Sequence, residues 1–498
     1  MSGGFRSRTK KAQEHAAEQA VDAGATAKQP HARSSNKQKK STPNGTGSIG
    51  DTAREAAFDA VLRVEAEDAF GNLILPQILR ERKVKGRDAA FATELTYGTL
   101  RSLGVLDAVI ADCSSRSLDS LAPEVLTALR LGTYQLLYTR VDAHAAVDTS
   151  VRLIDAAGHG QAKGFVNGIL RTISRTPAAR WMDKLVPADP IAATAFRTAH
   201  PEWIARSFAQ ALGEKNANEL NAALTADSQR PKVHLVARPG EMTAEELALI
   251  SGGEEGAYSP YAVYLEGGDP GSLEPVRDRM AAVQDEGSQL IALVAAEAPV
   301  TAQDGRSDDH GRWLDLCAGP GGKAALMAAL ANIDGAHVDA VEVSSVRADL
   351  VRKATEGLPV TVHVADGRDP GLEVGYDRVL VDAPCSGLGA LRRRPEARWR
   401  KSEDDIAELN TLQSELLASA VELAKPGGVI VYSTCSPDLR ETRGVVDKQL
   451  AEGNVEELDA RGFLPDMGDV GEHLSAQLWP HRHGTDAMFL AVLLKLPT

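Results

Sequence analysis

Two cysteines stand in short segments whose composition suits covalent chemistry. Cys385 lies in DAPCSG, which runs from Asp382 to Gly387, and Cys435 lies in STCS, which runs from Ser433 to Ser436. Each segment follows an apolar run that has the composition of a buried strand. A free cysteine is usually a buried, inert thiol, but an accessible thiolate is a strong nucleophile. Two thiols at neighbouring strand ends therefore predict a shared reactive cleft.

A glycine-rich turn lies upstream, in LDLCAGPGGK (Leu314–Lys323). Arg312–Leu316 predicts a short strand, and a helix is expected to begin at about Lys323. Glycine allows the backbone to approach a ligand closely because it has no Cβ. A strand, a turn and a helix N-terminus together form the nucleotide-binding device of α/β sheets. The spacing matches neither GxGxxG nor GxxxxGK[ST], which disfavours an NAD-dependent oxidoreductase, and the turn suits an uncharged or cationic ligand better than a pyrophosphate.

Acidic residues mark the ends of further predicted strands. Glu342 lies twenty residues after Gly322, the spacing at which an acid reaches ribose hydroxyls; the alternative is a cap on the following helix. Asp366, in ADGRD, could accept a hydrogen bond from an adenine amino group, or could be a turn residue. Asp382 immediately precedes Ala-Pro-Cys and could face both a cationic ligand and the edge of a base.

The elements that must position these residues alternate as strands and helices from residue 311 onward. Strands are predicted at residues 312–316, 337–343, 360–366, 377–383, 428–434 and 488–496. Their near-continuous apolar character is typical of a parallel sheet covered on both faces. Ligands in such sheets lie beyond the carboxyl ends of the strands. Residues 283–498 are therefore predicted to form an α/β, Rossmann-like domain with a mostly parallel sheet.

The remainder of the chain predicts three further regions. Residues 51–178 carry apolar residues at three- and four-residue steps, which predicts an all-helical domain of five to seven helices. Residues 179–282 alternate short helical and strand patterns and predict a linker with a small α+β subdomain. Residues 1–50 hold nine basic and three acidic residues and almost no large apolar ones. They predict a disordered basic tail, which either adds weak RNA affinity or only solubilises the protein.

Composition excludes several classes of protein. Four widely spaced cysteines among 498 residues are no disulfide framework, and they lack the paired spacing of a structural zinc site. No run of eighteen apolar residues and no signal-peptide pattern is present. The net charge of −14 argues against a generic nucleic-acid coat. We therefore expect a soluble, cytoplasmic monomer that binds neither metal nor membrane.

The motifs together resemble a known family. LDLCAGPGGK, DAPCSG, YSTCS and HGTDAMF are similar to the RNA cytosine-5 methyltransferases, and RLGTYQLLY and VNGILR resemble the NusB-like RNA-binding domain. In combination they resemble the bacterial RsmB (Sun/Fmu) type, which methylates 16S ribosomal RNA at a site of the cytosine 967 type. The likeness covers nearly everything after about residue 50. Glu342 stands where Asp is common, and Ala487-Met488 where GF-type residues are frequent; we expect both departures to adjust packing only.

The resemblance implies S-adenosylmethionine (SAM) as cofactor and a role for each motif residue. The implied SAM-binding residues are Cys317, Ala318, Gly319, Pro320, Gly321, Gly322, Lys323, Glu342, Asp366 and Asp382. Cys435 is implied as the nucleophile that adds to cytosine C6, because that addition makes C5 able to attack a methyl group. Asp382 would hydrogen-bond the base edge, and Cys385 would help release the product. We expect Cys317 to be a packing or backbone-contact position and not a nucleophile. We expect Lys323 to be a solvated lysine, although it could instead lower a thiol pKa or contact substrate.

A basic run is predicted to bind RNA. LRRRPEARWR (Leu391–Arg400) follows the first cysteine segment, and the target base must leave its stack to meet a thiol. Arginine binds phosphates in a bidentate manner, and a tryptophan can stack on a base. The predicted RNA-binding residues are Arg392, Arg393, Arg394, Arg398 and Trp399, with His481, Arg482 and His483 as additional candidates. The alternative is a solvated charged face.

Other functions stay open at this point. One is a catalytically silent NusB-like RNA-binding or assembly factor, against which the intact Cys385, Cys435 and Asp382 argue. Another is a methyltransferase that acts on transfer RNA, DNA or protein; the motifs do not exclude transfer RNA, and only the NusB-like region favours ribosomal RNA. The two cysteine roles could also be exchanged, because DNA cytosine enzymes have their nucleophile in a Pro-Cys segment.

Overall fold

The computed structural model describes residues 51–67, 69–300, 308–464 and 466–497. The predicted basic tail, residues 1–50, lies outside the described residues. The described chain forms two compact units. The first extends to Glu202 and includes Arg394–Arg400, and the second comprises Trp203–Arg393 and Lys401 onward. The first unit is thus longer than the expected 51–178, and it includes a segment from far along the sequence.

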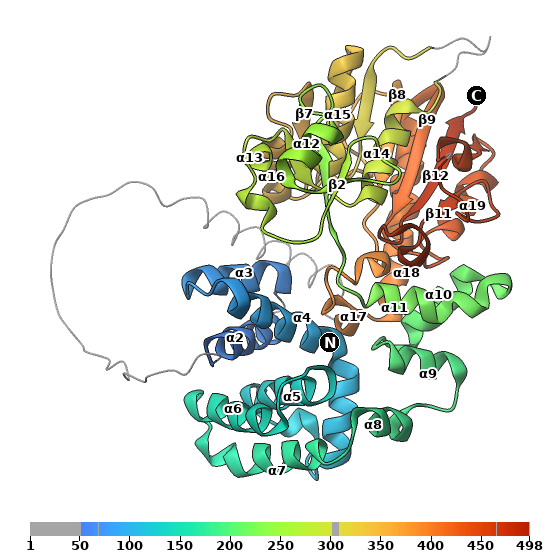
Figure 1. Cartoon of the computed structure of the whole chain (residues 1–498). Coiled ribbons are helices and arrows are strands. Elements are labelled where there is room, and N and C mark those ends of the chain that lie inside the picture. Colours follow the sequence, from blue (N-terminus) through green and yellow to red (C-terminus); the bar gives the residue numbers. More distant parts are fainter. Residues whose placement is uncertain (1–50, 68, 301–307, 465, 498) are drawn as a thin grey trace, which may run out of the picture. The chain divides into compact units, whose positions relative to one another are not determined.

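The first unit is helical in its described part (Figure 1). Its α-helices are α2 (Asp51–Glu67), α3 (Gly71–Glu81), α4 (Gly86–Cys113), α5 (Pro123–Tyr138), α6 (Ala143–Ala156), α7 (Lys163–Ser174), α8 (Ala178–Leu185), α9 (Pro190–Arg197) and α17 (Ala397–Arg400), with short 3-10 turns η1 (Leu118–Ser120) and η2 (Gly160–Ala162). The prediction of an all-helical domain is confirmed.

Local sequence explains where these helices begin and how they pack. Pro123 is the first residue of α5, where its missing N–H costs nothing. Asp142 caps α6 by accepting from the backbone N–H groups of His144 and Ala145. Apolar side chains at helical spacing then form one continuous core across α2 to α8. Glycine at position 132 allows Leu170 to approach α5 closely.

The second unit begins with helices and a small antiparallel sheet. Helices α10 (Glu202–Leu212) and α11 (Leu220–Asp227), with η3 (Glu214–Glu219) between them, precede the strands β1 (Val233–Ala237), β2 (Glu254–Glu255), β3 (Ala262–Leu265) and β4 (Ala281–Val283). The strand order is β2-β3-β1-β4. Helices α12 (Ala244–Ser251) and α13 (Glu274–Arg277) and the turn η4 (Pro270–Ser272) accompany it. The predicted α+β character of this region is present; β2 and β4 were not predicted.

A larger mixed sheet forms the rest of the unit. Its strands are β5 (Arg312–Asp315), β6 (His337–Val341), β7 (Val360–His363), β8 (Tyr376–Asp382), β9 (Ala424–Thr434), β10 (Val455–Leu458), β11 (Ala476–Gln477) and β12 (Phe489–Lys495). Their order is β10-β12-β9-β8-β5-β6-β7, and β11 pairs with β12. Strands β7, β6, β5, β8 and β9 are parallel neighbours, whereas β12 pairs antiparallel with β9 and β10. The predicted mostly parallel α/β fold is confirmed.

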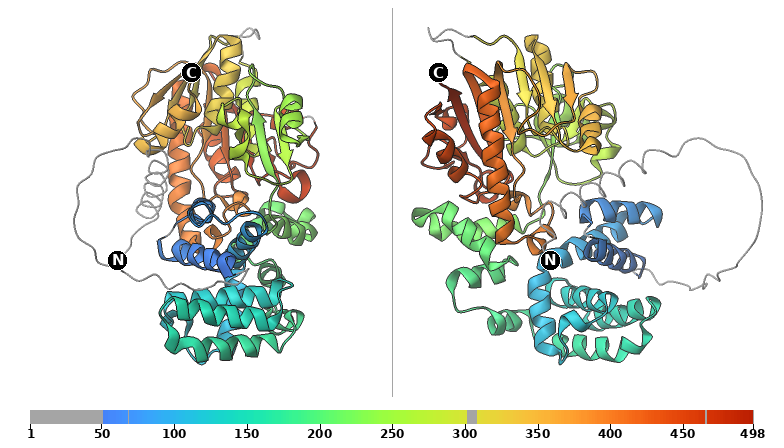
Figure 2. Two further views of the ribbon diagram at one scale, coloured as in Figure 1. Left: turned by 60° about the vertical axis from the view of Figure 1, so that its left-hand side comes forward. Right: turned by 180° about the vertical axis from the view of Figure 1, so that it is seen from behind.

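Helices cover both faces of this sheet. They are α14 (Glu286–Glu297), α15 (Gly322–Asp334), α16 (Ser345–Ala354), α18 (Glu403–Leu423), α19 (Arg443–Ala451) and α20 (Pro480–His483), with the turns η5 (Leu388–Ala390) and η6 (Ala460–Phe463). Figure 2 shows α18, in orange, alongside the strands. Its start is fixed by a capping box between Ser402 and Asp405.

The strands are apolar on both faces because each face packs against a different helical layer. Leu380 of β8 belongs to the core shared with α14 and α15, whereas its neighbours Val379 and Val381 belong to the core shared with α18 and α19. Val431 and Tyr432 of β9 divide between the two cores in the same way. Side chains alternate along a strand, so burial on both faces produces the continuous apolar runs seen in the sequence.

Candidate active site

The predicted site residues converge at the carboxyl ends of four parallel strands. Asp315 ends β5, Glu342 follows β6, Asp382 ends β8 and Cys435 follows β9. Asp382 pairs in register with Ser433, so the loops after β8 and β9 begin at the same level of the sheet. Parallel strands end at one edge, which is why motifs far apart in the sequence meet here.

The two cysteine thiols lie side by side. The Sγ atoms of Cys385 and Cys435 are 3.4 Å apart, and both side chains are partly exposed. The pKa of Cys435 is lowered, chiefly by the hydrogen bond that it shares with the Cys385 thiol and also by the nearby Lys323 ammonium, against burial and the charge of Asp382. The pKa of Cys385 is raised by the same Cys435 contact, by burial, and by the negative charges of Cys435, Glu441 and Asp382. The pair is therefore arranged to hold one thiolate, on Cys435, beside one thiol.

Lys323 is not a solvated lysine. Its side chain is 11% exposed, and its Nζ donates a hydrogen bond to Asp382 Oδ2 at 2.8 Å. Burial lowers the pKa of Lys323, but the charge and the hydrogen bond of Asp382 raise it by more. The pKa is therefore raised overall, and the group stays an ammonium. The expectation of a solvated lysine is wrong, because the helix start that carries Lys323 faces the strand end that carries Asp382. Ser433 Oγ donates to the other oxygen of Asp382 at 2.9 Å.

The carboxylate of Glu342 stabilises the glycine-rich turn by accepting a hydrogen bond from its backbone. Gly319 N–H donates to Glu342 Oε2 at 3.1 Å, and Ser344 N–H donates to Oε1 at 2.9 Å. Arg347 lies 3.4 Å from the same carboxylate and also donates to the carbonyl of Gly319. A Cβ at Gly319 would lie 2.1 Å from Glu342 Oε2, and Gly321 has a φ of +113°. Both positions therefore require glycine.

Asp315 lies beneath this turn and is fully buried. Burial and then the charge of Asp382 raise its pKa to about 7, against a hydrogen bond from Cys317 N–H to Oδ1. Its Oδ2 has no hydrogen-bond partner among the described residues. A buried carboxyl oxygen without a partner is costly, so this atom points to a polar group that the protein itself does not supply. Cys317 is partly buried in the same turn, and burial is the main reason that its pKa is raised well above its usual value.

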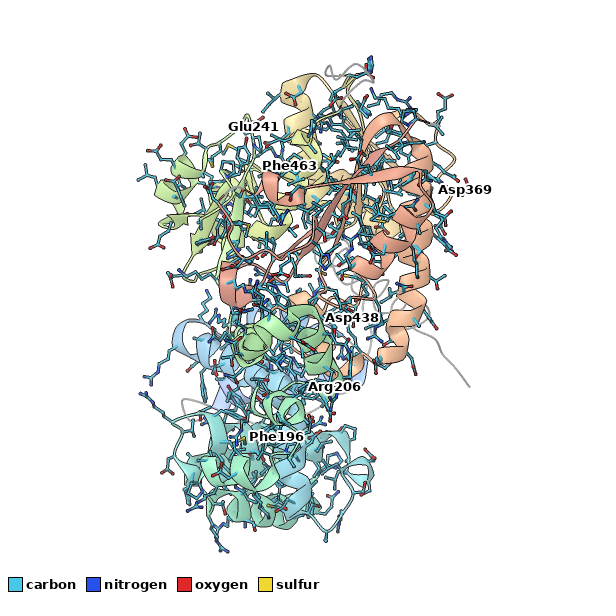
Figure 3. The ribbon with its side chains drawn as sticks, turned by 90° about the vertical axis from the view of Figure 1, so that its right-hand side faces the viewer. Phe196, Arg206, Glu241, Asp369, Asp438 and Phe463 are labelled. Carbon is cyan, nitrogen blue, oxygen red and sulfur yellow. The ribbon has the colours of Figure 1, made fainter. Side chains whose placement is uncertain are left out.

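Asp366, in the loop after β7, is held by an arginine beside an open pocket. It accepts from Arg368, which also pairs with Glu415 of α18. An open pocket of about 510 Å³ lies here, lined by Asp366, Arg368, Asp369, Glu415, Ala418, Ser419 and Glu422. Its lining includes neither cysteine and no residue of the glycine-rich turn. Figure 3 shows Asp369 well separated from Asp438, which belongs to the loop after β9.

Most side chains of the basic run contact other groups of the protein. Arg392 is 7% exposed and Arg398 is fully buried, so both side chains contact other protein groups in the structure, and their role in RNA binding stays a prediction. The Nε of Arg392 donates to Asp486 at 2.7 Å, and that of Arg393 to the same carboxylate at 2.8 Å. Asp285 lies 3.4 Å from Arg393. These two arginines and two carboxylates fasten the chain after Cys385 to the loop before β12.

The remainder of the run packs within the first unit. Arg398 donates to the carbonyl of Ala199 at 2.9 Å, and the indole N–H of Trp399 donates to the carbonyl of Leu100 at 2.9 Å. Arg394 is exposed and lies over the ring of Phe70. In the second unit, His481 and Arg482 contact Glu219, and His483 contacts Gly468. Arg394 is therefore the member of the run that keeps an exposed side chain.

The described residues contain no cluster of metal-ligating side chains. Among the described helices, none is long and apolar enough to cross a membrane.

Comparison with known proteins identifies the family. A NusB family model matches residues 51–175, and a model described as 16S rRNA methyltransferase RsmB/F matches residues 302–494. The ribosomal RNA small subunit methyltransferase B of Enterobacter sp. (strain 638) is 33% identical over 453 residues, which cover 89% of this chain and 98% of the relative. This chain belongs to the RsmB/F family. The family assignment made from the motifs is confirmed.

Further relatives agree with the RsmB/F assignment. The Mycobacterium tuberculosis (strain H37Rv) protein Rv1407 is 56% identical over 450 residues, covering 90% of this chain and 97% of that protein. The crystal structure of PH0851 has a TM-score of 0.75 at 23% identity and covers 90% of this chain and 99% of that one, which shows a shared fold. As an RsmB/F member the chain is an RNA methyltransferase, and membership of a methyltransferase family implies the use of SAM.

Sequence reasoning missed two groups of residues at this RsmB/F-type site. One is the ion-pair cluster of Asp285 and Asp486, although both lie in stretches, VQDEGSQ and HGTDAMF, whose acids precede apolar runs. The other is Glu441, a fully buried acid six positions after Cys435. Only the weak signal of an acid close behind the second cysteine motif pointed to it.

Proposed function

We propose that this chain transfers a methyl group from SAM to C5 of a cytosine in 16S ribosomal RNA, with Cys435 as the covalent nucleophile. It would act in the cytoplasm, where ribosomal RNA is found. The observation that supports this most is the pair of thiols 3.4 Å apart beside the Lys323–Asp382 ion pair. A lowered thiol pKa next to an ammonium is what a nucleophilic cysteine needs.

The residues around the glycine-rich turn fit SAM. Gly319 and Gly321 leave no room for a Cβ, and the unpartnered Oδ2 of Asp315 offers an acceptor. Glu342 can accept further hydrogen bonds from ribose hydroxyls, because a carboxylate has about four acceptor sites. When bound here, SAM supplies an electrophilic methyl group on a sulfonium centre. Asp366, in the loop after β7, is the adenine contact in this proposal.

The chain's own residues carry the remaining steps. The Cys435 thiolate adds to C6 of the cytosine, and the electrons displaced toward C5 make that carbon nucleophilic. Asp382 accepts a hydrogen bond from the amino group of the base and so positions the edge of the base. Lys323 holds Asp382 in place and favours the thiolate. After methyl transfer, the C5 proton leaves to solvent and the Cys435–C6 bond breaks, and the Cys385 thiol, 3.4 Å away, is placed to donate a hydrogen bond to the departing Cys435 thiolate.

Labelled SAM and purified RNA test the proposal. The full chain is incubated with 16S ribosomal RNA or with transfer RNA, and the nucleosides are separated by mass spectrometry. We expect labelled 5-methylcytosine in the ribosomal RNA. Label only in transfer RNA would assign the other substrate, label on another base would refute the thiol mechanism, and RNA binding without label would favour a non-catalytic assembly factor.

A further inference from the structure

A single buried carboxylate connects the two cysteine loops. Glu441 is fully buried, and its Oε1 accepts from the backbone N–H of Ser386 at 2.7 Å, while Oε2 accepts from the hydroxyl of Ser386. Gln413 of α18 donates to Oε1 at 3.1 Å. Ser386 directly follows Cys385, and Glu441 belongs to the segment that follows Cys435. A carboxylate of the second cysteine loop therefore holds the first cysteine loop in place through hydrogen bonds.

The hydrogen-bond directions in this network are determined by chemistry. The Ser386 hydroxyl has one proton, and Glu441 accepts it. The hydroxyl of Ser436, 3.1 Å from that of Ser386, must then be the donor in their contact. Ser436 directly follows Cys435, so a chain of donors runs from the second cysteine loop through Ser386 to Glu441. All three residues are at most 1% exposed, which makes every one of these hydrogen bonds costly to lose.

Glu441 also has no cationic partner among the ion pairs of the described residues, so its charge is met by neutral donors. That charge lies on the Cys385 side of the thiol pair. After the contact with Cys435 and burial, it contributes to the raised pKa of Cys385. Lys323, by contrast, acts on Cys435. Glu441 thus acts on Cys385, whereas the opposed charges of Asp382 and Lys323 act on Cys435, and this difference gives the thiol pair a polarity.

We propose that Glu441 is a positioning residue: it holds the two cysteine loops at the separation that brings the two thiols into hydrogen-bond contact, and it places a carboxylate on the Cys385 side of the pair. Only the expected effect of Glu441 on methyl transfer rests on the proposed function. The placement of the loops and the polarity of the thiol pair are properties of the protein without RNA. Glu441 touches neither thiol and acts through Ser386.

The experiment compares Glu441→Gln and Glu441→Asp with a matched control. Glu457→Gln is the control, because Glu457 is also a buried acid of the second unit (8% exposed) but pairs with Arg443 instead of a cysteine loop. Iodoacetamide alkylation of the full chain without RNA is followed against pH, and mass spectrometry separates the modification of Cys435 from that of Cys385. Methyl transfer to 16S ribosomal RNA is measured in parallel.

Wild type and Glu457→Gln are expected to be alkylated at Cys435 at lower pH than at Cys385. In Glu441→Gln, the preference for Cys435 is expected to fall about tenfold, the equivalent of one pKa unit. Its kcat is expected to fall by about 10²-fold, as for a misplacement of reacting groups by about 1 Å, with KM for SAM unchanged. Glu441→Asp, which keeps the charge, should retain more of the thiol preference than of kcat.

The proposal is overturned if Glu441→Gln matches Glu457→Gln in both thiol preference and kcat. If Glu441→Gln does not fold by circular dichroism, Ser386→Ala replaces it, since that change removes the hydroxyl link and keeps the backbone one. An unchanged thiol preference in folded Ser386→Ala would then overturn the proposal. A third outcome is possible, in which the wild-type chain methylates no RNA but its alkylation preference for Cys435 still depends on Glu441. That outcome would refute the proposed function and would support the positioning role of Glu441.

Discussion

The loop after β8 and the loop after β9 each present one cysteine to the same sheet edge, but the charges that act on the two thiols differ: only anions act on Cys385, whereas the Lys323 cation also acts on Cys435. Cys435 has the Lys323 ammonium nearby, which lowers its pKa, whereas the Glu441 carboxylate helps to raise that of Cys385. Both loops carry a short motif in which a cysteine follows an apolar strand, and neither motif alone distinguishes nucleophile from acid. The difference teaches that the neighbours of each thiol, and not the motif around it, assign the role.

Replacing each of the two cysteines by alanine should give the largest difference between the two loops. Cys435→Ala removes the proposed nucleophile, so we expect complete loss of methyl transfer and of any covalent RNA adduct. Cys385→Ala leaves addition and transfer intact but slows release of the methylated base. We therefore expect a protein–RNA adduct that survives denaturing electrophoresis in Cys385→Ala and disappears in the double variant.

The opposite pattern would exchange the roles of the two loops. An adduct trapped by Cys435→Ala and absent from Cys385→Ala would make Cys385 the nucleophile, against the charge asymmetry described above. Turnover preserved in both single variants would remove the thiols from the mechanism altogether.

Gly319→Val tests whether the cofactor turn is independent of both cysteine loops. The added Cβ would collide with Glu342 Oε2, so we expect the Kd for SAM, measured by calorimetry, to rise by at least about 10²-fold, the scale of about 3 kcal/mol. Alkylation of both thiols should keep its wild-type pH dependence. Gly462→Val, in an open turn of the same unit, serves as the control. Unchanged SAM affinity in Gly319→Val, or tight NAD binding by the wild type, would contradict the cofactor assignment.

Replacing Lys323 tests how far its positive charge distinguishes Cys435 from Cys385. Loss of its positive charge raises the pKa of Cys435, so the thiolate forms only at higher pH. We expect the rising, acid side of the pH–rate profile to move to higher pH in Lys323→Gln, and activity below neutral pH to fall about tenfold for every pH unit by which that side moves. The falling side, set by the raised pKa of Cys385, should stay. Lys425→Gln, which breaks a comparably buried ion pair with Asp377, should leave the profile in place.

The smallest effect is expected in the run that follows the first cysteine loop. Arg394 is its exposed arginine, so Arg394→Gln should weaken RNA binding a few-fold and reduce the slope of log affinity against log salt by about 0.7, the value for one phosphate contact on single-stranded RNA. SAM affinity should not change. Arg180→Gln, an exposed arginine of α8, is the control. Equal slopes in the two variants would remove Arg394 from the RNA-binding surface.

Much of the fold could be predicted from the sequence because it depends on local patterns. Continuous apolar runs predicted β5, β6, β8 and β9, and three- and four-residue spacing predicted the helices of the first unit. Short-range chemistry also located the turn at Gly319 and the cysteines that follow two strands. The edge strands β2 and β4 escaped prediction, because pieces of two or three residues carry too little periodicity.

The sequence by itself determined which motifs lie at strand ends, since strand, turn and helix are each encoded within a few residues. Only the tertiary structure decided what each charged side chain faces there. Lys323 and Asp382 lie 59 positions apart, yet form a 2.8 Å ion pair because β5 and β8 are neighbours. Arg398 reads as a surface arginine, yet it is fully buried against Ala199. The environment of a charge depends on partners brought in by long-range packing, and a local pattern carries no information about them.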